Sequence, residues 1–336
     1  MNPPDTPLPN TPLLRVRVAA KSMLAEGICG LELVAADGGA LPAFTAGAHI
    51  DLHLGPGLVR PYSLCNDPQE THRYRLGVLR ESASRGGSAA VHERLRVGDT
   101  LQIGRPRNLF ALAEPLQQGR HRLLAGGIGI TPLLAMARTL HRAGADFRLH
   151  VAARTRARLA YADELAAAPW AGRVHIHLDD GPESDRLDLG RLLADRRDGD
   201  HLYLCGPAGL IAAARNAAAA AGWPATQVHI ESFGAPTGAP LGADTPTAGG
   251  FELQLARSGR VIHVAPDQTA LQALHAAGCD VPSSCEQGIC GTCLTPVLSG
   301  TPDHRDHYLE PDEQAANDQF LPCCSRAKSA RLVVDL

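Results

Sequence analysis

The chain has 336 residues, enough for two or three domains with well-packed cores, and it carries 32 basic against 35 acidic side chains. This near balance does not favour nucleic acid or anionic lipid as a partner. The first residues, MNPPDTPLPNTPLL, contain neither a basic stretch nor an apolar core, and no apolar run approaches the roughly 20 residues of a membrane span. We therefore expect a cytoplasmic protein with no membrane partner.

The first segment, residues 13–112, contains short stretches in which apolar and polar residues alternate between glycines. This pattern predicts antiparallel strands in a small β-barrel. The stretches are LLRVRV, GLELVA, HIDLHL, YRLGVL and DTLQIG, and one helix is predicted from Gly87–Ser88 over AAVHERL.

Two motifs in this segment contain residues that bind flat or phosphorylated ligands. Arg60-Pro61-Tyr62-Ser63 follows a predicted strand, and Arg85-Gly86-Gly87-Ser88 opens the predicted helix. An arginine and a glycine-rich helix start can hold a terminal phosphate, while a tyrosine and a serine can stack against and hydrogen-bond a planar heterocycle. From the residue types alone, an ordinary turn and a capped helix are slightly favoured.

The second segment, residues 120–233, alternates apolar strands with amphipathic or alanine-rich helices. Such alternation predicts a parallel, doubly wound sheet. Its strands are HRLLAGG, FRLHVAAR, VHIHLDD, LYLCG and VHIES, and its helices are PLLAMARTLHRAG, YADELAAA, LDLGRLLAD and AGLIAAARNAAAAAG.

Residues 125–132, AGGIGITP, end a strand and open a helix in this segment. Thr131 can cap the helix, Pro132 suits its first turn, and the free N–H groups make an anion site that fits a dinucleotide diphosphate. Alone the signal is weak, because such a turn can reflect tight packing only. Cys205-Gly206-Pro207 ends a later strand on the same carboxyl edge, where these folds bind ligands. The alternative for Cys205 is a small, buried side chain that only packs in the core.

The third segment follows residues 234–249, which are rich in Gly, Pro, Ala and Thr and are predicted to be a linker. FELQLARSGRVIHVA then predicts a hairpin and DQTALQALHAAG a short helix. These elements, followed by a cysteine loop, are typical of a compact α+β domain of the β-grasp type.

Four cysteines in this third segment have the spacing of an iron–sulfur site. Cys285, Cys290 and Cys293 form C-x4-C-x2-C with Gly288 and Gly291 between them, and Cys323 follows later. Four thiolates at plant-type spacing hold a [2Fe–2S] cluster. Buried or disulfide-bonded cysteines are the alternative, but buried thiols have no reason to fall at this spacing around glycines, and no oxidising compartment is indicated.

Many motifs in register closely resemble one family, that of phthalate dioxygenase reductase and vanillate demethylase reductase, within the ferredoxin–NADP reductase superfamily. The motifs are RPYSLCNDPQ, RGGS, GRPRNLF, AGGIGITPLLAMA, LCGP, HIESFG, PSSCEQGICGTC, HRDHYL and CCSRAKSA. The resemblance implies an FMN-binding barrel over residues 1–115, an NAD-binding domain over 116–233, the linker, and a ferredoxin domain over 250–336.

The resemblance also implies roles for individual residues, with Ser63, Cys205 and Glu231 expected at the reacting atoms. Tyr62 would lie along the isoalloxazine and Ser63 near its N5. Residues expected to contact the flavin are Arg60, Pro61, Tyr62, Ser63, Gly77, Val78 and Leu79, with Arg85, Gly86, Gly87 and Ser88 at the FMN phosphate. Residues expected at the nucleotide are Gly127, Ile128, Gly129, Ile130 and Thr131, and Cys205, Gly206, Pro207, Glu231 and Phe233 resemble groups near the nicotinamide. The alternative interpretation of Glu231 is a carboxylate on the surface of a strand.

Other residues are given simpler interpretations. Cys324 adjoins Cys323, and neighbouring side chains point apart in extended backbone, so we expect one of them at the cluster. Cys29, Cys65 and Cys279 are expected to be buried thiols. His304-Arg305-Asp306-His307 is expected to be a hydrogen-bonded surface turn, and Arg154, Arg156 and Arg158 are expected to be solvated, although they could hold the 2′-phosphate of NADPH.

The resemblance implies that electrons pass from NADH to FMN, then singly to the cluster and to an external acceptor. The expected acceptor is the Rieske-type terminal oxygenase of an aromatic-ring dioxygenase or O-demethylase system, and a carnitine-type or haem monooxygenase is the alternative. A monooxygenase acting on its own substrate would need an oxygen-activating centre that the sequence does not show. A carrier without NADH activity is disfavoured by GGIGITP and LCGP. We expect a monomer.

Overall fold

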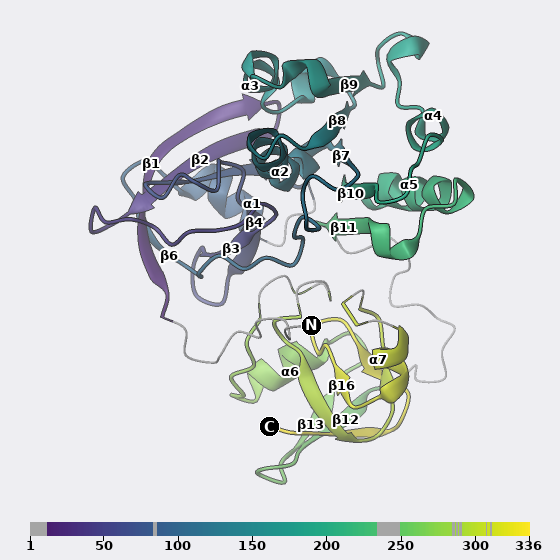
Figure 1. The fold of residues 1–336 in the computed structure, drawn as a ribbon. Helices are drawn as coiled ribbons and strands as arrows, with labels where there is room; N and C mark the ends of the chain where they lie inside the picture. The colour runs from purple at the N-terminus through teal and green to yellow at the C-terminus, as the bar shows by residue number, and fades with distance from the viewer. Residues whose placement is uncertain are drawn as a thin grey trace. The chain divides into compact units, whose positions relative to one another are not determined.

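The computed structural model describes residues 12–82, 86–233, 249–283, 286, 288, 291–306, 308–309 and 311–336 (Figure 1). The residues up to Phe233 form one compact unit, and those from Gly249 onward form a second. Each unit is described by itself.

The first part of the larger unit is an antiparallel sheet that closes into a barrel. Its strands are β1 (Leu14–Ala25), β2 (Ile28–Ala35), β3 (His49–His53), β4 (Val59–Ser63), β5 (Tyr74–Leu79) and β6 (Thr100–Ile103), in the order β4-β3-β6-β1-β2-β5. Leu64, directly after β4, bridges Leu76 of β5, and Cys65 N donates to Arg75 O at 3.0 Å. These pairings join β4 to β5, the two strands at opposite ends of the sheet, so the sheet closes into the predicted barrel.

Alternation along the strands separates the barrel core from its surface. In β1 the side chains of Val16 and Val18 are fully buried, whereas Arg15 and Arg17, which alternate with them, are exposed. Pairing with β2 and β6 fixes this register, so a shift by one residue would turn the valines outward. The motif Arg60–Ser63 comes after the predicted strand, now β3, but it lies within β4, a strand that the sequence did not predict.

The predicted helix of the barrel spans residues 87–94. It begins as α1 (Gly87–Ala89) and continues as a π-helical segment, Ala90–Arg94, in which Leu95 N donates to Ala90 O at 3.1 Å. π-Helical turns are rare and are often found at functional sites.

The second part of the larger unit is a parallel sheet covered by helices on both faces. Its strands are β7 (Arg120–Gly126), β8 (Asp146–Ala153), β9 (Val174–Leu178), β10 (His201–Gly206) and β11 (Val228–Ser232), in the order β11-β10-β7-β8-β9. The helices are α2 (Ile130–Arg142), α3 (Ala162–Ala167), α4 (Leu189–Leu193) and α5 (Ala208–Ala220). Leu123 of β7 packs with α2 and α3, whereas its neighbour Leu124 packs with α4 and α5 (Figure 1). The doubly wound fold is confirmed.

The barrel and the parallel sheet share one hydrophobic core and a set of ion pairs. Phe110 and Ile28 from the barrel side are buried with the residues of α2. Arg75 of β5 donates to both carboxylate oxygens of Glu164 in α3, at 2.8 and 3.3 Å, and Arg138 of α2 bonds the same carboxylate. These contacts fix the two parts against each other.

The smaller unit has the mixed sheet of a β-grasp domain, as predicted. Its elements are β12 (Phe251–Leu255), β13 (Val261–Val264), α6 (Ala270–Ala276), β14 (Thr295–Ser299), β15 (Pro302–Asp303), α7 (Pro311–Ala316), β16 (Gln319–Phe320), β17 (Arg326–Ala327) and β18 (Arg331–Val334). The sheet order is β13-β12-β18-β14-β16, with β12 and β18 parallel, and β15 pairs with β17. Thr269 and Gln272 form a capping box at the start of α6.

Gly47→Ala tests the packing between the barrel and α2. Gly47 has φ of 94°, and a Cβ there would collide with the carbonyl oxygen of Phe110. Gly38 has φ of 78° but no atom within 4 Å of the added carbon. We expect Gly38→Ala to lower the free energy of unfolding by roughly 1–2 kcal/mol and Gly47→Ala by roughly 2–5 kcal/mol, in urea denaturation. Equal losses would contradict the packing described here.

Candidate functional site

Three side chains from distant parts of the sequence meet where the barrel contacts the parallel sheet. Ser63 ends β4, Cys205 lies in β10, and Glu231 pairs with Cys205 in the adjacent strand β11. The Ser63 hydroxyl donates to Glu231 Oε2 at 3.2 Å, and the Cys205 thiol lies 4.0 Å from the same oxygen. The structure therefore brings together the three residues expected at the reacting atoms.

The environment of these three groups changes how they hold protons. Burial raises the pKa of the Glu231 carboxyl to about 8, and the hydrogen bond from Ser63 opposes only part of that rise. Burial, reinforced by Glu231, holds the pKa of the Cys205 thiol well above its ordinary value. The site can therefore hold a proton on Glu231 near neutral pH, and Cys205 is a neutral thiol rather than a nucleophilic thiolate. Glu231 is half-buried on β11, and its Oε2 accepts the hydrogen bond from Ser63.

The two barrel motifs contact each other. A Cβ on Gly87 would lie 2.5 Å from Arg60 Cγ, so the arginine stem crosses directly over the glycine turn. Gly86 has φ of 90° and is the N-terminal cap of α1, and Ser88 Oγ accepts from Glu81 N at 3.1 Å. Arg85 lies outside the described residues. The described part of the motif fits a phosphate held at a glycine turn beside an arginine.

The other expected flavin-contacting residues lie nearby. Tyr62 is half-buried beside the barrel core, and burial raises its pKa, so its phenol stays neutral. Gly77, Val78 and Leu79 are in β5, where Val78 O lies 2.9 Å from His92 Nε2 in the helix.

In the glycine-rich loop after β7, one glycine is needed for close packing against β10 and another leaves free space beside the backbone. A Cβ on Gly129 would collide with the Cys205 carbonyl, so this glycine is required for packing against β10. Gly127 has φ of 54°, and no atom lies within 4 Å of a Cβ added there. The loop backbone is accessible at Gly127, as a nucleotide phosphate would need. The predicted cap is wrong: α2 begins at Ile130, and the Thr131 hydroxyl donates to Ile128 O at 3.0 Å.

The rest of the LCGP and HIESFG motifs surround this site. Pro207 is the N-terminal cap of α5, whose first turn begins beside Gly206 and the glycine-rich loop. Phe233, just after β11, is 40% exposed, so its ring is available for a ligand.

Tyr161 is a residue of this contact that the sequence did not indicate. It has φ of 62°, and its hydroxyl lies 3.2 Å from Cys65 Sγ and would be 2.7 Å from a Cβ on Gly77. That Cβ would also lie 2.9 Å from Thr131 Cγ2. Gly77 thus lets the expected flavin strand touch the nucleotide loop, and a positive φ for tyrosine is visible only in the structure.

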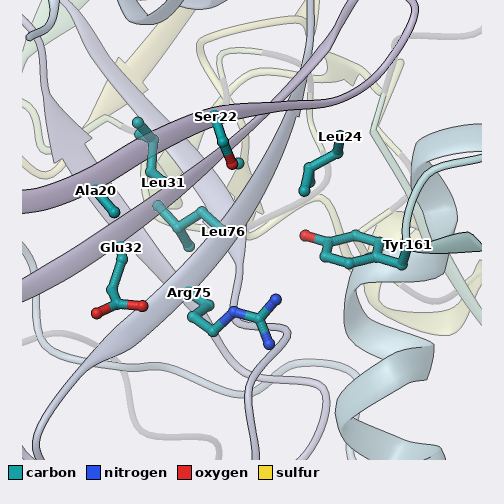
Figure 2. Close-up of a pocket in the computed structure, with 9 residues that line it drawn as sticks. Ala20, Ser22, Leu24, Leu31, Glu32, Arg75, Leu76 and Tyr161 are labelled. Atoms are coloured by element: carbon teal, nitrogen blue, oxygen red, sulfur yellow. The ribbon is translucent and has the colours of Figure 1, made fainter. Parts of the chain in front are cut away.

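A small pocket lies on the barrel side of Tyr161. Figure 2 shows the Arg75 guanidinium extending toward the Tyr161 ring, and its central carbon lies 5.9 Å from the ring centroid. The pocket holds about 140 Å³, whereas ligand sites for drug-sized molecules span roughly 300–1,000 Å³. It is too small for a flavin or a dinucleotide.

In the smaller unit, Cys293 and Cys323 share a buried site, with exposed fractions of 3% and 5%. Gly288 N donates to Cys323 Sγ at 3.3 Å, and hydrogen bonds from Cys293 and its neighbours lower the pKa of Cys323. A cluster ligand must be a thiolate, and this environment fits one. Cys285 and Cys290 lie outside the described residues.

Two expectations near this site are wrong. Residues 322–324 form a turn rather than extended backbone, and Cys324 hydrogen-bonds with Cys323 instead of pointing away from it. Asp306 is buried rather than on a surface turn: it accepts from Leu309 N at 2.9 Å and from Ser325 Oγ at 3.2 Å. Asp306 thereby ties the HRDHYL stretch to the segment that carries Cys323.

The remaining simple interpretations have mixed outcomes. Cys29 and Cys65 are buried free thiols as expected, whereas Cys279 is only half-buried. Arg154, Arg156 and Arg158 are exposed, and Arg158 pairs with Glu26 at 3.0 Å. Among the described residues, none of the helices combines the length and apolarity needed to cross a bilayer.

Comparison with known proteins identifies the family. An oxidoreductase NAD-binding domain matches residues 123–216, and a 2Fe-2S iron-sulfur cluster binding domain matches residues 253–328. Vanillate O-demethylase oxidoreductase of Pseudomonas sp. (strain HR199 / DSM 7063) is 49% identical over 324 residues, covering 96% of this chain and 100% of that protein. The chain belongs to the phthalate dioxygenase reductase and vanillate O-demethylase oxidoreductase family.

Two further members extend the comparison. A solved structure of phthalate dioxygenase reductase, described as modular for electron transfer from pyridine nucleotides to [2Fe–2S], is 39% identical, with a TM-score of 0.75, and covers 96% of this chain and 98% of its own. The heme-dependent oxidative N-demethylase beta subunit of Ectopseudomonas mendocina (strain ymp) is 43% identical, covering 96% of this chain and 99% of that protein.

Family membership confirms the predicted class of function. This reductase is an NAD(P)H-dependent flavin and iron–sulfur oxidoreductase, the component that supplies electrons to an oxygenase. The oxidoreductase fold accounts for the glycine loop, and the cluster domain accounts for the cysteine spacing.

Glu231→Gln tests the protonation of the central carboxyl. Because the pKa of about 8 lies above the ordinary value of 4.5, the folded protein binds the proton more tightly than the unfolded chain does. The stabilising contribution of protonated Glu231 is complete below pH 4.5 and is lost as the pH rises through 8. We expect the wild type to lose stability relative to Glu231→Gln between these values, measured by urea denaturation at several pH values. A difference that does not change with pH would contradict the raised pKa.

Proposed function

We propose that this reductase binds FMN in the barrel, oxidises NADH at the contact between Ser63, Cys205 and Glu231, and passes electrons to a Rieske-type terminal oxygenase. One observation supports this most strongly: the last residue of the flavin motif is hydrogen-bonded to a carboxyl of the nucleotide domain. A ring lying along Tyr62 and a nicotinamide reaching the glycine loop would meet there. In this proposal residues 1–115 bind FMN, residues 116–233 bind NADH and residues 250–336 hold the cluster. Residues 234–249 form the linker.

Ser63 and Glu231 form a proton-holding pair at this meeting point. The Ser63 hydroxyl lies at the edge of the flavin ring in this proposal, and it donates a hydrogen bond to Glu231. When bound, FMN accepts a hydride as an electron pair and releases the two electrons singly, which suits a one-electron cluster. Glu231, with its raised pKa, can store or supply the accompanying proton near neutral pH. Cys205, as a neutral thiol, shapes the nicotinamide pocket without reacting.

FMN is favoured over FAD by the turn at Arg85, Gly86, Gly87 and Ser88. Gly86 gives the turn a left-handed backbone with φ of 90°, and the Arg60 stem crosses directly over Gly87. A glycine turn at a helix start beside Arg60 suits a terminal phosphate dianion better than an internal diphosphate ester.

NADH is favoured over NADPH by the surroundings of the three arginines after β8. Arg158 is engaged with Glu26. Asp179 and Asp180 lie beside the end of β8, where their N–H groups donate to the carbonyls of Ala153 and Arg154. Two carboxylates at this edge would repel a 2′-phosphate.

The acceptor is proposed to be the Rieske-type oxygenase of an O-demethylase or aromatic-ring dioxygenase system. The 49% identity to a vanillate O-demethylase oxidoreductase supports this choice. A haem oxygenase is the second candidate, because the beta subunit of a heme-dependent oxidative N-demethylase is 43% identical. Rates of NADH-driven electron transfer to a purified oxygenase of each type distinguish the two.

We also propose that the protein is a cytoplasmic monomer. Free cysteines in both described units, including Cys29, Cys65 and Cys205, are consistent with a reducing compartment.

Ser63→Ala tests the proposed flavin–nicotinamide meeting point. Removing the hydroxyl disorders the edge of the ring that receives the hydride, and we expect flavin reduction by NADH to slow roughly tenfold or more in anaerobic stopped-flow measurements. Ser22→Ala, at an exposed position on β1 of the same barrel, is the matched control and should keep the wild-type rate. If NADH reduced the flavin of Ser63→Ala at the wild-type rate, this placement of the flavin would be refuted.

Cys293→Ser tests the order of the electron path. We expect the variant to lose cluster iron, visible cluster absorbance and transfer to the oxygenase, because serine does not replace a thiolate ligand. NADH should still bleach the flavin. Cys279→Ser, which alters a half-buried cysteine of the same unit outside the proposed ligand set, should keep the cluster. If NADH no longer reduced the flavin in Cys293→Ser but still reduced it in Cys279→Ser, the electron path would not be modular.

A further inference from the structure

Lys21, a half-buried residue of β1, makes an unusual set of contacts with the helix of the barrel. It is one of two lysines in the chain, the other being Lys328, while the remaining basic residues among the 32 are arginines. From β1, its ammonium group donates to Val91 O at 2.7 Å, His92 O at 2.8 Å and Leu95 O at 2.8 Å. All three acceptors are backbone carbonyls at the C-terminal end of the helix at residues 87–94.

These carbonyls are the ones that the helix leaves for an outside donor. The N–H of Leu95, which an α-helix would direct to Val91 O, donates to Ala90 O in the π-helical turn. The next N–H, that of Arg96, donates to Asp99 Oδ2 at 2.7 Å. Lys21 therefore supplies the hydrogen bonds that would otherwise close the last turn.

A lysine suits this position better than an arginine. Its ammonium group carries three N–H bonds that diverge tetrahedrally and can reach three carbonyls, whereas a guanidinium presents its donors in one plane. Its positive charge also lies at the negative end of the helix dipole. The geometry thus gives a physical reason for a lysine in a chain where arginine is otherwise the rule.

The opposite end of this helix carries the proposed phosphate turn. Gly86 caps that end in a left-handed conformation, and Ser88 Oγ in the same turn accepts from Glu81 N at 3.1 Å. The C-terminal half is held by Lys21 and by His92, whose Nε2 lies 2.9 Å from Val78 O of β5. The helix is therefore held at both ends, and the contacts of its far end add to those of the turn in setting the direction in which the turn faces.

We propose that Lys21 is a positioning residue for the terminal phosphate of FMN. It anchors the C-terminal end of the helix at residues 87–94 to β1, and this anchoring holds the Gly86–Ser88 turn in the orientation that receives a phosphate monoester. An eight-residue helix is about 12 Å long, so Lys21 acts through the helix and not by touching the phosphate. The inference rests on the proposed FMN site.

Riboflavin provides the discriminating probe, because it has the same ring as FMN but no phosphate. We compare the Kd of FMN and of riboflavin by fluorescence titration of the full-length chain freed of flavin. In Lys21→Met, the Kd of FMN should rise about tenfold while that of riboflavin changes less than about twofold, as expected for loss of one helix-end interaction. Lys328→Met, the same change at an exposed lysine of the other unit, should leave both values unchanged.

The outcomes separate this inference from the site on which it rests. An unchanged ratio of the two Kd values in Lys21→Met, including an equal rise in both, would overturn a positioning role for Lys21. Wild-type protein that binds FMN and riboflavin equally would overturn the proposed phosphate turn itself. If Lys21→Met does not fold, Lys21→Arg carries the test: it keeps the charge but not the three-carbonyl geometry, and its FMN-to-riboflavin ratio should shift in the same direction by a smaller amount.

Discussion

The hydrogen bond between Ser63 and Glu231 is the contact on which the redox site depends. It joins a strand end of the barrel to the edge strand of the parallel sheet, 168 positions apart in the sequence. The bond forms because Cys205 and Glu231 are paired in neighbouring strands and because Ser63 ends the strand that carries the expected flavin motif. Chemistry between two bound cofactors needs this kind of fixed meeting point.

The surrounding packing makes the contact rigid. Gly129 brings the glycine-rich loop closer to the backbone of β10 than a side chain would permit, and Gly77 leaves room on β5 for the Tyr161 hydroxyl and the Thr131 methyl group. Arg75 and Arg138 share the carboxylate of Glu164, so α2, α3 and the barrel are tied through one group. A half-buried and shared ion pair of this kind fixes orientation more than it adds net stability.

The sequence predicted the elements better than their contacts. Alternation such as that of Val16 and Val18 reports which face of a strand is buried, and the glycines of residues 125–132 mark a strand-to-helix turn. Ser63, Cys205 and Glu231 were each predicted from a motif, but their mutual distances depend on how the barrel packs on the sheet. The raised pKa of Glu231 follows from that burial, and no local pattern reports it.

Residues that act through a special backbone conformation were also outside the reach of the sequence. The positive φ of Tyr161 and the turn at residues 322–324 depend on tertiary packing, and the expectation that Cys324 points away from Cys323 failed because it assumed extended backbone. Lys21 is visible in the sequence only as a rare lysine. Its three acceptors arise from a π-helical turn some 70 residues later, and single-sequence periodicity does not predict such turns.

The central claim is that one polypeptide converts the electron pair of NADH into single electrons at its iron–sulfur site. Electron paramagnetic resonance of the full-length protein, frozen after anaerobic mixing with NADH, tests it most directly. We predict the signal of a reduced [2Fe–2S] cluster together with loss of the oxidised flavin absorbance. A bleached flavin beside a cluster that stays oxidised and silent would contradict the account.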